Sequence, residues 1–140
     1  MIVVDTNVLS EAMRDTANGR VVEWMDAQAV ETLFLSAITV AELRFGIAVL
    51  SAGKRRDKMS ARLEQEVLPV FAGRVLPFDM DASETYAVLM ARARQKGKAI
   101  AKADGYIAAT AASRGFAVAT RDMSPFKAAG VPVVDPWDGD

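Results

Sequence analysis

The segment IVVDTN, residues 2–7, joins a run of three apolar residues directly to an aspartate. A short apolar run that ends at a polar residue and precedes helical spacing is typical of a buried strand in a parallel sheet. In open α/β sheets, ligands bind beyond the carboxyl ends of the strands. We therefore expect Asp5 at the edge of a sheet where ligands bind.

Four further apolar runs occur along the chain, and segments with helical spacing separate them. Continuous apolar strands between helices favour a sheet that is covered on both faces, so the sequence predicts an α/β fold with a central, mostly parallel sheet of about five strands. The chain contains no internal repeat, low-complexity tract or linker, and we expect one domain, residues 1–140. The four runs are residues 33–35, 75–78, 116–119 and 131–134.

Polar residues predict where several helices begin and end. Asn18 is an expected N-cap, and Thr39 with Glu42 has the S/T-x-x-E spacing of a capping box. Asp81, with a glutamate three residues later, offers a similar start, and Gly115 is an expected stop for an alanine-rich helix. The helix after the predicted N-cap carries an apolar stripe of Val21, Val22, Trp24 and Met25.

The chain contains no histidine and no cysteine. This composition excludes Ser-His-Asp and Cys-His triads, a two-histidine ribonuclease mechanism, disulfides, and zinc sites built on nitrogen or sulfur. Any catalytic metal would be held by carboxylates, carbonyls, hydroxyls and water. That donor set favours magnesium or manganese over softer ions.

Four acidic residues lie where a parallel sheet would form such a site. Asp5 and Asp122 follow predicted strands at the same edge of the sheet. Glu42 is expected in the first turn of the helix after the second strand, and Asp104 opens the helix before the fourth strand in an apolar setting. Carboxylates that are forced together stay ionised only beside a cation. Magnesium bound by one or two carboxylates can orient water for attack on phosphorus, so the pattern predicts phosphodiester hydrolysis.

Each acid also has a purely structural interpretation, because helix N-termini and turns favour acidic side chains. Hydroxyl and amide groups beside the acids, on Thr6, Asn7 and Thr120, could likewise hold a water or a phosphate oxygen or serve only in turns and caps. The structural alternatives for the acids are a helix N-cap for Asp5, a capping box for Glu42, a helix-dipole interaction for Asp104 and an Asx turn for Asp122.

The net charge of -1 gives no overall attraction to nucleic acid, but positive charge is concentrated in two blocks. Each block is interpreted either as a solvated helix face or as a phosphate-contacting surface. The first block comprises Lys54, Arg55, Arg56, Lys58 and Arg62, and the second comprises Arg92, Arg94, Lys96, Lys98 and Lys102.

The longest stretch without charge is residues 32–41, about half of the roughly 20 residues that a membrane-spanning helix requires. The N-terminus shows neither a basic leader nor a small-residue cleavage site. We therefore expect a cytoplasmic protein that makes no membrane contact.

Four segments carry a resemblance to a known family through their order and spacing. They are VVDTNVLSE at 3–11, LSAITVAELRFGI at 35–47, ADGYIAATAASRG at 103–115 and VATRD at 118–122. On these segments the chain resembles a PIN-domain ribonuclease, specifically the VapC-type toxin of a toxin–antitoxin pair, and it is especially similar to the FitB subgroup. The resemblance covers essentially the whole chain.

This resemblance implies a PIN-like fold and a metal-dependent endoribonuclease. The implied site holds Mg²⁺ or Mn²⁺ on Asp5, Glu42, Asp104 and Asp122, with the Thr120 hydroxyl beside them. The implied partners are an RNA substrate, a second copy of the chain in a homodimer, and a small antitoxin whose tail enters the active-site groove. Such antitoxins usually carry a DNA-binding domain, so a toxin–antitoxin hetero-oligomer on operator DNA is also implied.

One departure from the family pattern leaves a second function open. Many relatives have Asn-x-x-Asp-Phe at the last segment, whereas here Asp122 takes the asparagine place and Pro125 precedes Phe126. The alternative is a weakly or non-catalytic PIN module that binds a DNA-binding antitoxin and stabilises the complex on operator DNA. An aspartyl-phosphate phosphatase is disfavoured, because that chemistry typically requires a second aspartate where Asn7 stands.

Overall fold

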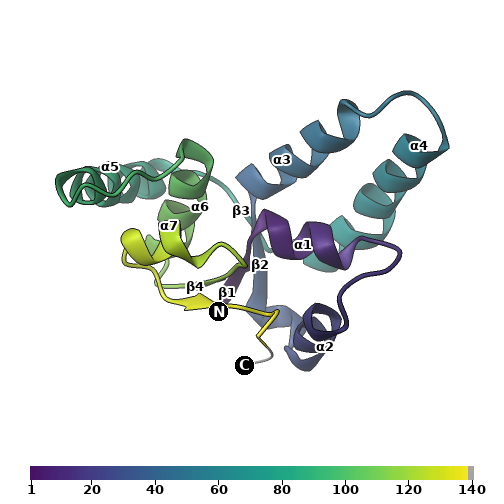
Figure 1. Ribbon diagram of the computed structural model, residues 1–140, viewed down its shortest axis with the longest axis horizontal. Coiled ribbons are helices and arrows are strands. Elements are labelled where there is room, and N and C mark those ends of the chain that lie inside the picture. The colour runs from purple at the N-terminus through teal and green to yellow at the C-terminus, as the bar shows by residue number, and fades with distance from the viewer. Residues whose placement is uncertain (139–140) are drawn as a thin grey trace.

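The computed structural model describes residues 1–138 as a five-stranded sheet with helices on both faces (Figure 1). The strands lie in the order β3-β2-β1-β4-β5, and every neighbouring pair is parallel. The predicted α/β class with a parallel sheet of five strands is therefore confirmed. The strands are β1 (Ile2–Val4), β2 (Leu33–Ser36), β3 (Val75–Leu76), β4 (Ala117–Ala119) and β5 (Val133–Val134).

The first strand of the chain is the central strand of the sheet. Val3 of β1 pairs with Phe34 of β2 on one side and with Val118 of β4 on the other. Because these three strands are parallel, their carboxyl ends meet at one edge of the sheet. Asp5 directly follows β1 and Thr120 directly follows β4, so this edge brings the two side chains together.

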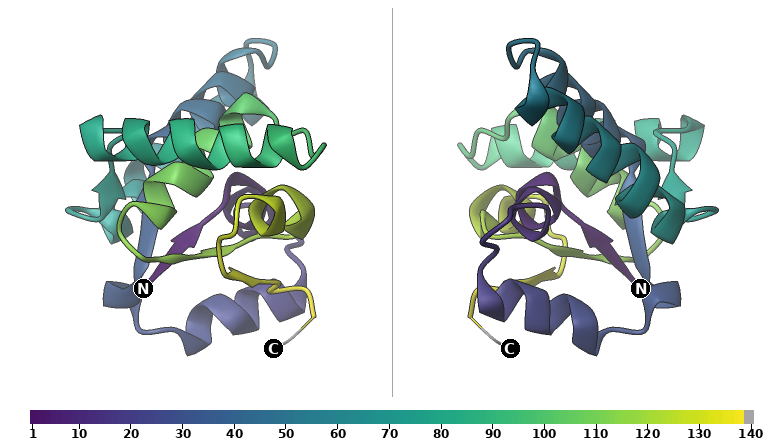
Figure 2. Two further views of the ribbon diagram at one scale, coloured as in Figure 1. Left: turned by 90° about the vertical axis from the view of Figure 1, so that its left-hand side faces the viewer. Right: turned by 90° about the vertical axis from the view of Figure 1, so that its right-hand side faces the viewer.

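Seven α-helices accompany the sheet within residues 1–138. The helices α3 and α4 form a hairpin that projects from one side, whereas α5 lies at the opposite side and crosses over α6 (Figures 1 and 2). Among the residues that the structure describes, no helix has the length and apolar character that crossing a membrane requires. The helices are α1 (Thr6–Ala12), α2 (Gly19–Ala27), α3 (Ala37–Ala48), α4 (Lys54–Ala61), α5 (Met80–Gln95), α6 (Lys102–Ala112) and α7 (Met123–Ala128).

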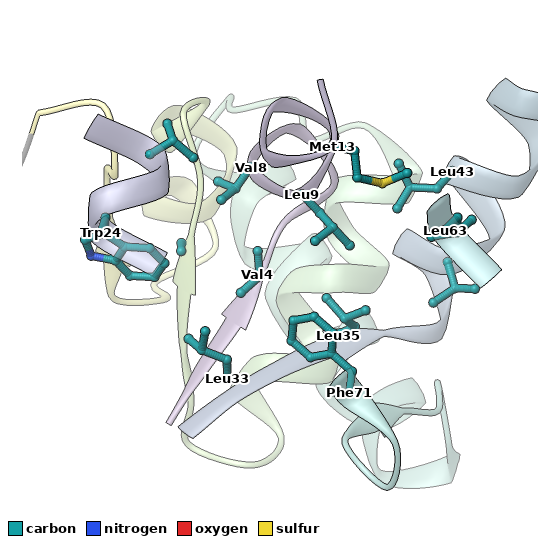
Figure 3. Packing of buried hydrophobic residues seen from close by; sticks show 13 residues of the cluster. Val4, Val8, Leu9, Met13, Trp24, Leu33, Leu35, Leu43, Leu63 and Phe71 are labelled. Atoms are coloured by element: carbon teal, nitrogen blue, oxygen red, sulfur yellow. The ribbon is translucent and has the colours of Figure 1, made fainter. Parts of the chain in front are cut away.

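The sheet separates two apolar cores, because successive residues of a strand point to opposite faces. Val4 packs in the first core with residues of α1, α2 and α3, including Val8, Leu9 and Trp24 (Figure 3). Val3 packs in the second core with residues of α5, α6 and α7. Burial of both faces explains why β1 is a continuous apolar run rather than an alternating one.

The start of α3 differs from the prediction. Ser36, the last residue of β2, is the N-cap, and its hydroxyl accepts a hydrogen bond of 3.1 Å from the amide of Ile38. The predicted capping box of Thr39 and Glu42 is wrong, because the serine directly after the strand already caps the helix. Thr39 lies buried inside α3, and Glu42 lies in its second turn rather than its first.

Of the two other predicted helix starts, the one at Asn18 is correct and the one at Asp81 is not. Asn18 caps α2 as predicted, although Val22 of the expected apolar stripe is exposed. The predicted start of α5 at Asp81 is wrong. Asp79 is the N-cap instead, because its carboxylate accepts a hydrogen bond of 2.9 Å from the amide of Ala82.

The strands β3 and β5 are each two residues shorter than the apolar runs that predicted them, and β4 is one residue shorter. The run 75–78 pairs only as far as residue 76, and the run 131–134 pairs only from residue 133. Pro77 and Pro132 account for these ends, because proline has no amide hydrogen to donate to a neighbouring strand.

Candidate active site

Asp5 is a buried carboxylate whose two oxygens accept hydrogen bonds from different parts of the chain. Its Oδ1 accepts a hydrogen bond of 2.8 Å from the amide of Thr6, so the N-cap interpretation of Asp5 is confirmed. Its Oδ2 accepts a hydrogen bond of 2.9 Å from the hydroxyl of Thr120. The side chain is only 4% exposed, and burial raises the pKa of Asp5 to about 6. Repulsion by Asp104 and Glu42 adds to this rise in pKa, and the two hydrogen bonds oppose it.

Thr120 connects the strand edge to the loop that precedes α7. Its fully buried hydroxyl donates to Asp5 and accepts hydrogen bonds from the amide of Asp122 at 3.1 Å and from Nδ2 of Asn7 at 3.2 Å. Asn7 Oδ1 in turn accepts from the amide of Arg121 at 3.2 Å. One hydroxyl therefore fixes segments from the two ends of the chain.

Asp122 occupies the N-cap position of α7 without capping it. Its carboxylate accepts no hydrogen bond from the helix, so the Asx-turn interpretation is wrong. The backbone of Asp122 is held by Thr120, which leaves the carboxylate available to a ligand.

Glu42 reaches the site from α3 through Thr6. The Thr6 hydroxyl lies 2.7 Å from Oε1 of Glu42 and 3.0 Å from the hydroxyl of Thr39. Glu42 itself is exposed, whereas Thr39 is fully buried. The hydroxyl pair therefore orients the Glu42 carboxylate, and Thr39 serves this contact rather than a helix cap.

Asp104 lies in the first turn of α6, as the dipole interpretation requires, but other carboxylates determine its surroundings. Burial raises the pKa of Asp104, and repulsion by Asp122 and then by Glu42 raises the pKa further. Asp104 and Asp122 also line the same hollow. The structure thus brings Asp104 into the electrostatic neighbourhood of the other acids without a hydrogen bond to them.

The negative charge at this edge is not balanced by the protein itself. None of the ion pairs formed within residues 1–138 involves Asp5, Glu42, Asp104 or Asp122. In the same part of the chain, no three acidic side chains stand close enough to enclose a metal ion alone. The donor set nevertheless fits a hard cation, since Mg²⁺ accepts one or two carboxylates and keeps several waters.

Sequence reasoning missed the role of two polar residues. Thr39 was assigned to a helix cap, although its position between Ile38 and Val40 in an apolar helix could have indicated a buried hydroxyl. Lys127 lies in the hollow beside Asp104, and no sequence pattern marked it.

Replacing Thr120 by valine is expected to raise the pKa of Asp5 above 6 and to lower the free energy of unfolding by about 1–3 kcal/mol. The variant removes the donor to Asp5 and the acceptor of the Asp122 backbone amide, and it leaves the side-chain amide of Asn7 with only its 3.4 Å contact to Asp5 Oδ2. Carbon-detected NMR titration of the Asp5 carboxyl and urea unfolding measure the two effects. Thr120→Ser is the matched control and should retain both values, so equal behaviour of valine and serine variants would contradict the assigned hydrogen bonds.

Comparisons with known proteins point to one family. Residues 2–131 match the family described as PIN domain. The chain is 63% identical to the VapC ribonuclease Y4jK of Sinorhizobium fredii, with 99% of each chain covered. It is 53% identical to toxin FitB of Neisseria gonorrhoeae, over 98% of this chain and 99% of the relative. The structure of FitAB bound to an IR36 DNA fragment matches with a TM-score of 0.94 and 52% identity, over 98% of this chain and 96% of that chain. These findings confirm the resemblance inferred from the four sequence segments.

Proposed function

Because this chain belongs to the PIN-domain family, we propose that it is the toxin of a toxin–antitoxin system and a metal-dependent endoribonuclease. The relatives named VapC ribonuclease and toxin FitB support the class of activity. The observation that carries the proposal is the group of acids at the carboxyl edge of the sheet, none of which forms an ion pair with a lysine or arginine within residues 1–138. An RNA phosphodiester is the proposed substrate.

In this proposal Asp5, Glu42, Asp104 and Asp122 form the site for Mg²⁺ or Mn²⁺, with one or two of these carboxylates binding the ion directly and the others through water molecules. When bound, the ion would neutralise charge on the scissile phosphate and make a water molecule more acidic. Oδ1 of Asp5 caps the helix, and Oδ2, which accepts a hydrogen bond from Thr120, would bind the ion through a remaining lone pair.

The remaining polar residues orient these acids. Thr120 holds Asp5 through Oδ2 and holds the backbone of Asp122, while Thr6 holds Glu42. Asp104 accepts no hydrogen bond within residues 1–138 and lines the open hollow, so its carboxylate is placed where a substrate would enter. Fixed acids of this kind reduce the reorganisation that a reaction requires.

We also propose the partners of this toxin. They are a second copy of the chain in a homodimer and an antitoxin with a DNA-binding domain, with the hetero-oligomer bound to operator DNA. The FitAB structure bound to a DNA fragment supports this part of the proposal through its likeness to the present fold. The toxin would act in the cytoplasm, where RNA and operator DNA are both accessible.

A second candidate function rests on the last sequence segment. Pro125 stands in α7 where many relatives have an aspartate, so this turn adds no carboxylate to the site. A PIN module with weak or no catalysis would then act mainly by binding the antitoxin and stabilising its complex on operator DNA.

Metal removal separates the two functions. The purified, antitoxin-free protein is expected to cleave single-stranded RNA with Mg²⁺, to lose cleavage with EDTA, and to regain it when Mg²⁺ or Mn²⁺ is added in excess. Gel electrophoresis of end-labelled RNA measures the result. Protein that forms a tight antitoxin–DNA complex but shows no metal-dependent cleavage would overturn the ribonuclease proposal and favour the second function.

The affinity for Mg²⁺ is expected to rise as pH increases from 5 to about 6 and to level off above pH 7. Burial holds the pKa of Asp5 near 6, so a proton competes with the cation below that value. In the limit of one competing proton the affinity changes about tenfold per pH unit. Isothermal titration calorimetry with Mg²⁺ between pH 5 and 8 measures the dependence. A constant affinity across this range would show that Asp5 does not bind the ion.

A further inference from the structure

A hollow of about 800 Å³ opens beside the proposed metal ligands Asp104 and Asp122. It lies between the loop that joins α5 to α6 and the helix α7, and α6 packs against α7 beside it (Figure 1). Lys98 of the loop and Lys127 of α7 line the same hollow. Two carboxylates and two cations thus share one open surface.

Both lysines are free to meet an external anion. Each is exposed, and neither forms an ion pair with an acid in the part of the chain described here. The first basic block behaves differently, because Lys58 and Arg62 of that block pair with Asp15 at 3.1 and 3.0 Å. Within residues 1–138, Lys98 and Lys127 therefore keep their positive charge unpaired beside the acids.

The backbone positions of the two lysines are fixed. Gly97 adopts a left-handed φ of 72° after α5, and the amide of Lys98 donates to the carbonyl of Ala93 at 2.9 Å. This is the hydrogen bond of a Schellman helix end. Lys127 follows Phe126, which is fully buried in the second core. The lysine side chains extend from anchored points rather than from loose loops.

The positive lining continues away from the acids. A second hollow of about 600 Å³ is lined by Lys98 and by Arg94 near the end of α5. Lys98 therefore belongs to both hollows, and one path leads from Asp104 past Lys98 to Arg94. This path follows the second basic block, which the catalytic site itself does not use.

The lysines beside the acids would reduce electrostatic repulsion between the site and an approaching phosphate. A phosphodiester that approaches four acidic side chains is repelled unless positive charge lies along its approach. Lysine binds phosphate as a flexible point charge without reading the base, and such contacts provide sequence-independent affinity.

We propose that Lys98 and Lys127 bind the phosphates of single-stranded RNA that neighbour the scissile phosphate, and that Arg94 extends this path. The proposal rests on the proposed ribonuclease function, since it names the residues that position the substrate of the same site. Lys98 and Lys127 are positioning residues and do not touch the reacting atoms.

The test measures RNA binding separately from cleavage. A fluorescein-labelled RNA of about ten nucleotides, within the 4–16 typical of single-strand sites, is titrated with the full-length protein in EDTA, and anisotropy is followed at several KCl concentrations. Lys98→Gln and Lys127→Gln are each expected to weaken binding by about three- to tenfold. Each should also reduce the slope of log affinity against log salt by about 0.7, the value for one contact to a single strand.

Kinetics with Mg²⁺ and a matched variant complete the test. In both glutamine variants KM for RNA should rise by a similar factor while kcat changes less than about twofold, because only substrate positioning is affected. Arg14→Gln makes the same charge change at an exposed residue outside the hollow and outside both basic blocks, and it should leave RNA binding and KM unchanged.

The outcomes distinguish this proposal from the function on which it rests. If Lys98→Gln and Lys127→Gln bind RNA as the wild type does, the proposed role of the two lysines is refuted even where Mg²⁺-dependent cleavage is observed. If they weaken binding of the antitoxin complex to operator DNA and leave RNA binding unchanged, the surface serves DNA and the proposal is also refuted. RNA binding that depends on the two lysines, without any cleavage, would support their role in RNA binding and refute the proposed ribonuclease function.

Discussion

Replacing Asp5 by asparagine is expected to abolish RNA cleavage while leaving the fold intact. The asparagine carbonyl can keep the hydrogen bond from the Thr6 amide, but the amide nitrogen that replaces the second carboxylate oxygen cannot bind a cation. Loss of an outer-shell partner of a metal typically costs 10–100-fold, so loss of a direct ligand should cost at least about a hundredfold. Cleavage of end-labelled RNA under single-turnover conditions measures the effect.

The same variant should be more stable than the wild type at neutral pH in EDTA. The pKa of Asp5 rises from its ordinary value of 3.8 to about 6, so the folded protein disfavours the ionised carboxylate. Asp5 should therefore make the wild type lose stability as pH rises from about 4 through 6, by up to roughly 3 kcal/mol, and Asp5→Asn should lose less, because only the raised pKa of Asp104 remains. Urea unfolding at pH 4 and pH 8 compares the two proteins.

An acid outside the site is the control for both measurements. Asp26→Asn on α2 removes an exposed carboxylate that belongs to neither the sheet edge nor the hollow beside it. It should cleave RNA as the wild type does and should show the wild-type change of stability with pH. If Asp5→Asn also cleaves RNA normally, the assignment of Asp5 to the metal site is wrong.

Replacing Phe126 by alanine is expected to cost about 3–5 kcal/mol of the free energy of unfolding. Phe126 is fully buried in the second core, and its removal leaves a cavity between α7 and the sheet. A protein of this size is stable by roughly 5–15 kcal/mol, so this loss is a large part of the total. The melting temperature should fall by about 10–20 °C. Differential scanning calorimetry and urea unfolding measure the loss.

Phe45→Ala is the matched control for this prediction. Phe45 lies on α3 with 69% of its surface exposed, so the same substitution there should change the free energy of unfolding by less than about 0.5 kcal/mol. Equal losses at Phe45 and Phe126 would mean that the second core does not depend on α7.

The sequence predicted the sheet well because each strand carries its own signal. A strand buried on both faces must be apolar throughout, and the runs at β1, β2 and β4 are visible without knowledge of their partners. The helix α4 was foreseen only as one of two interpretations of the first basic block, a solvated helix face, and its bounds were not predicted. Its sequence KRRDKMSA contains too few apolar residues for helical periodicity to appear, although packing against α3 holds it in place.

The sequence predicted the acidic residues of the site but not the hydrogen bonds that hold them. Asp5 and Asp122 follow strands, and the parallel order of strands is enough to place them at one edge. The hydrogen bond between Asp5 and Thr120 joins residues 115 positions apart, and no local spacing encodes it. The position of Glu42 depends on competition between Ser36 and Thr39 for the helix start, which the structure decides for Ser36.

The central place of β1 has a consequence for synthesis of the chain on the ribosome. Ala117 on β4, the neighbour of Ile2, is made 115 residues after it, which takes roughly 6–23 s at ordinary rates of elongation. Until then β1 has no partner on that side, and Thr120 and Asp122 do not yet exist. A nascent fragment that ends before Thr120 therefore lacks two of the polar residues that meet at this edge of the sheet, and the edge forms only after β4 has been made.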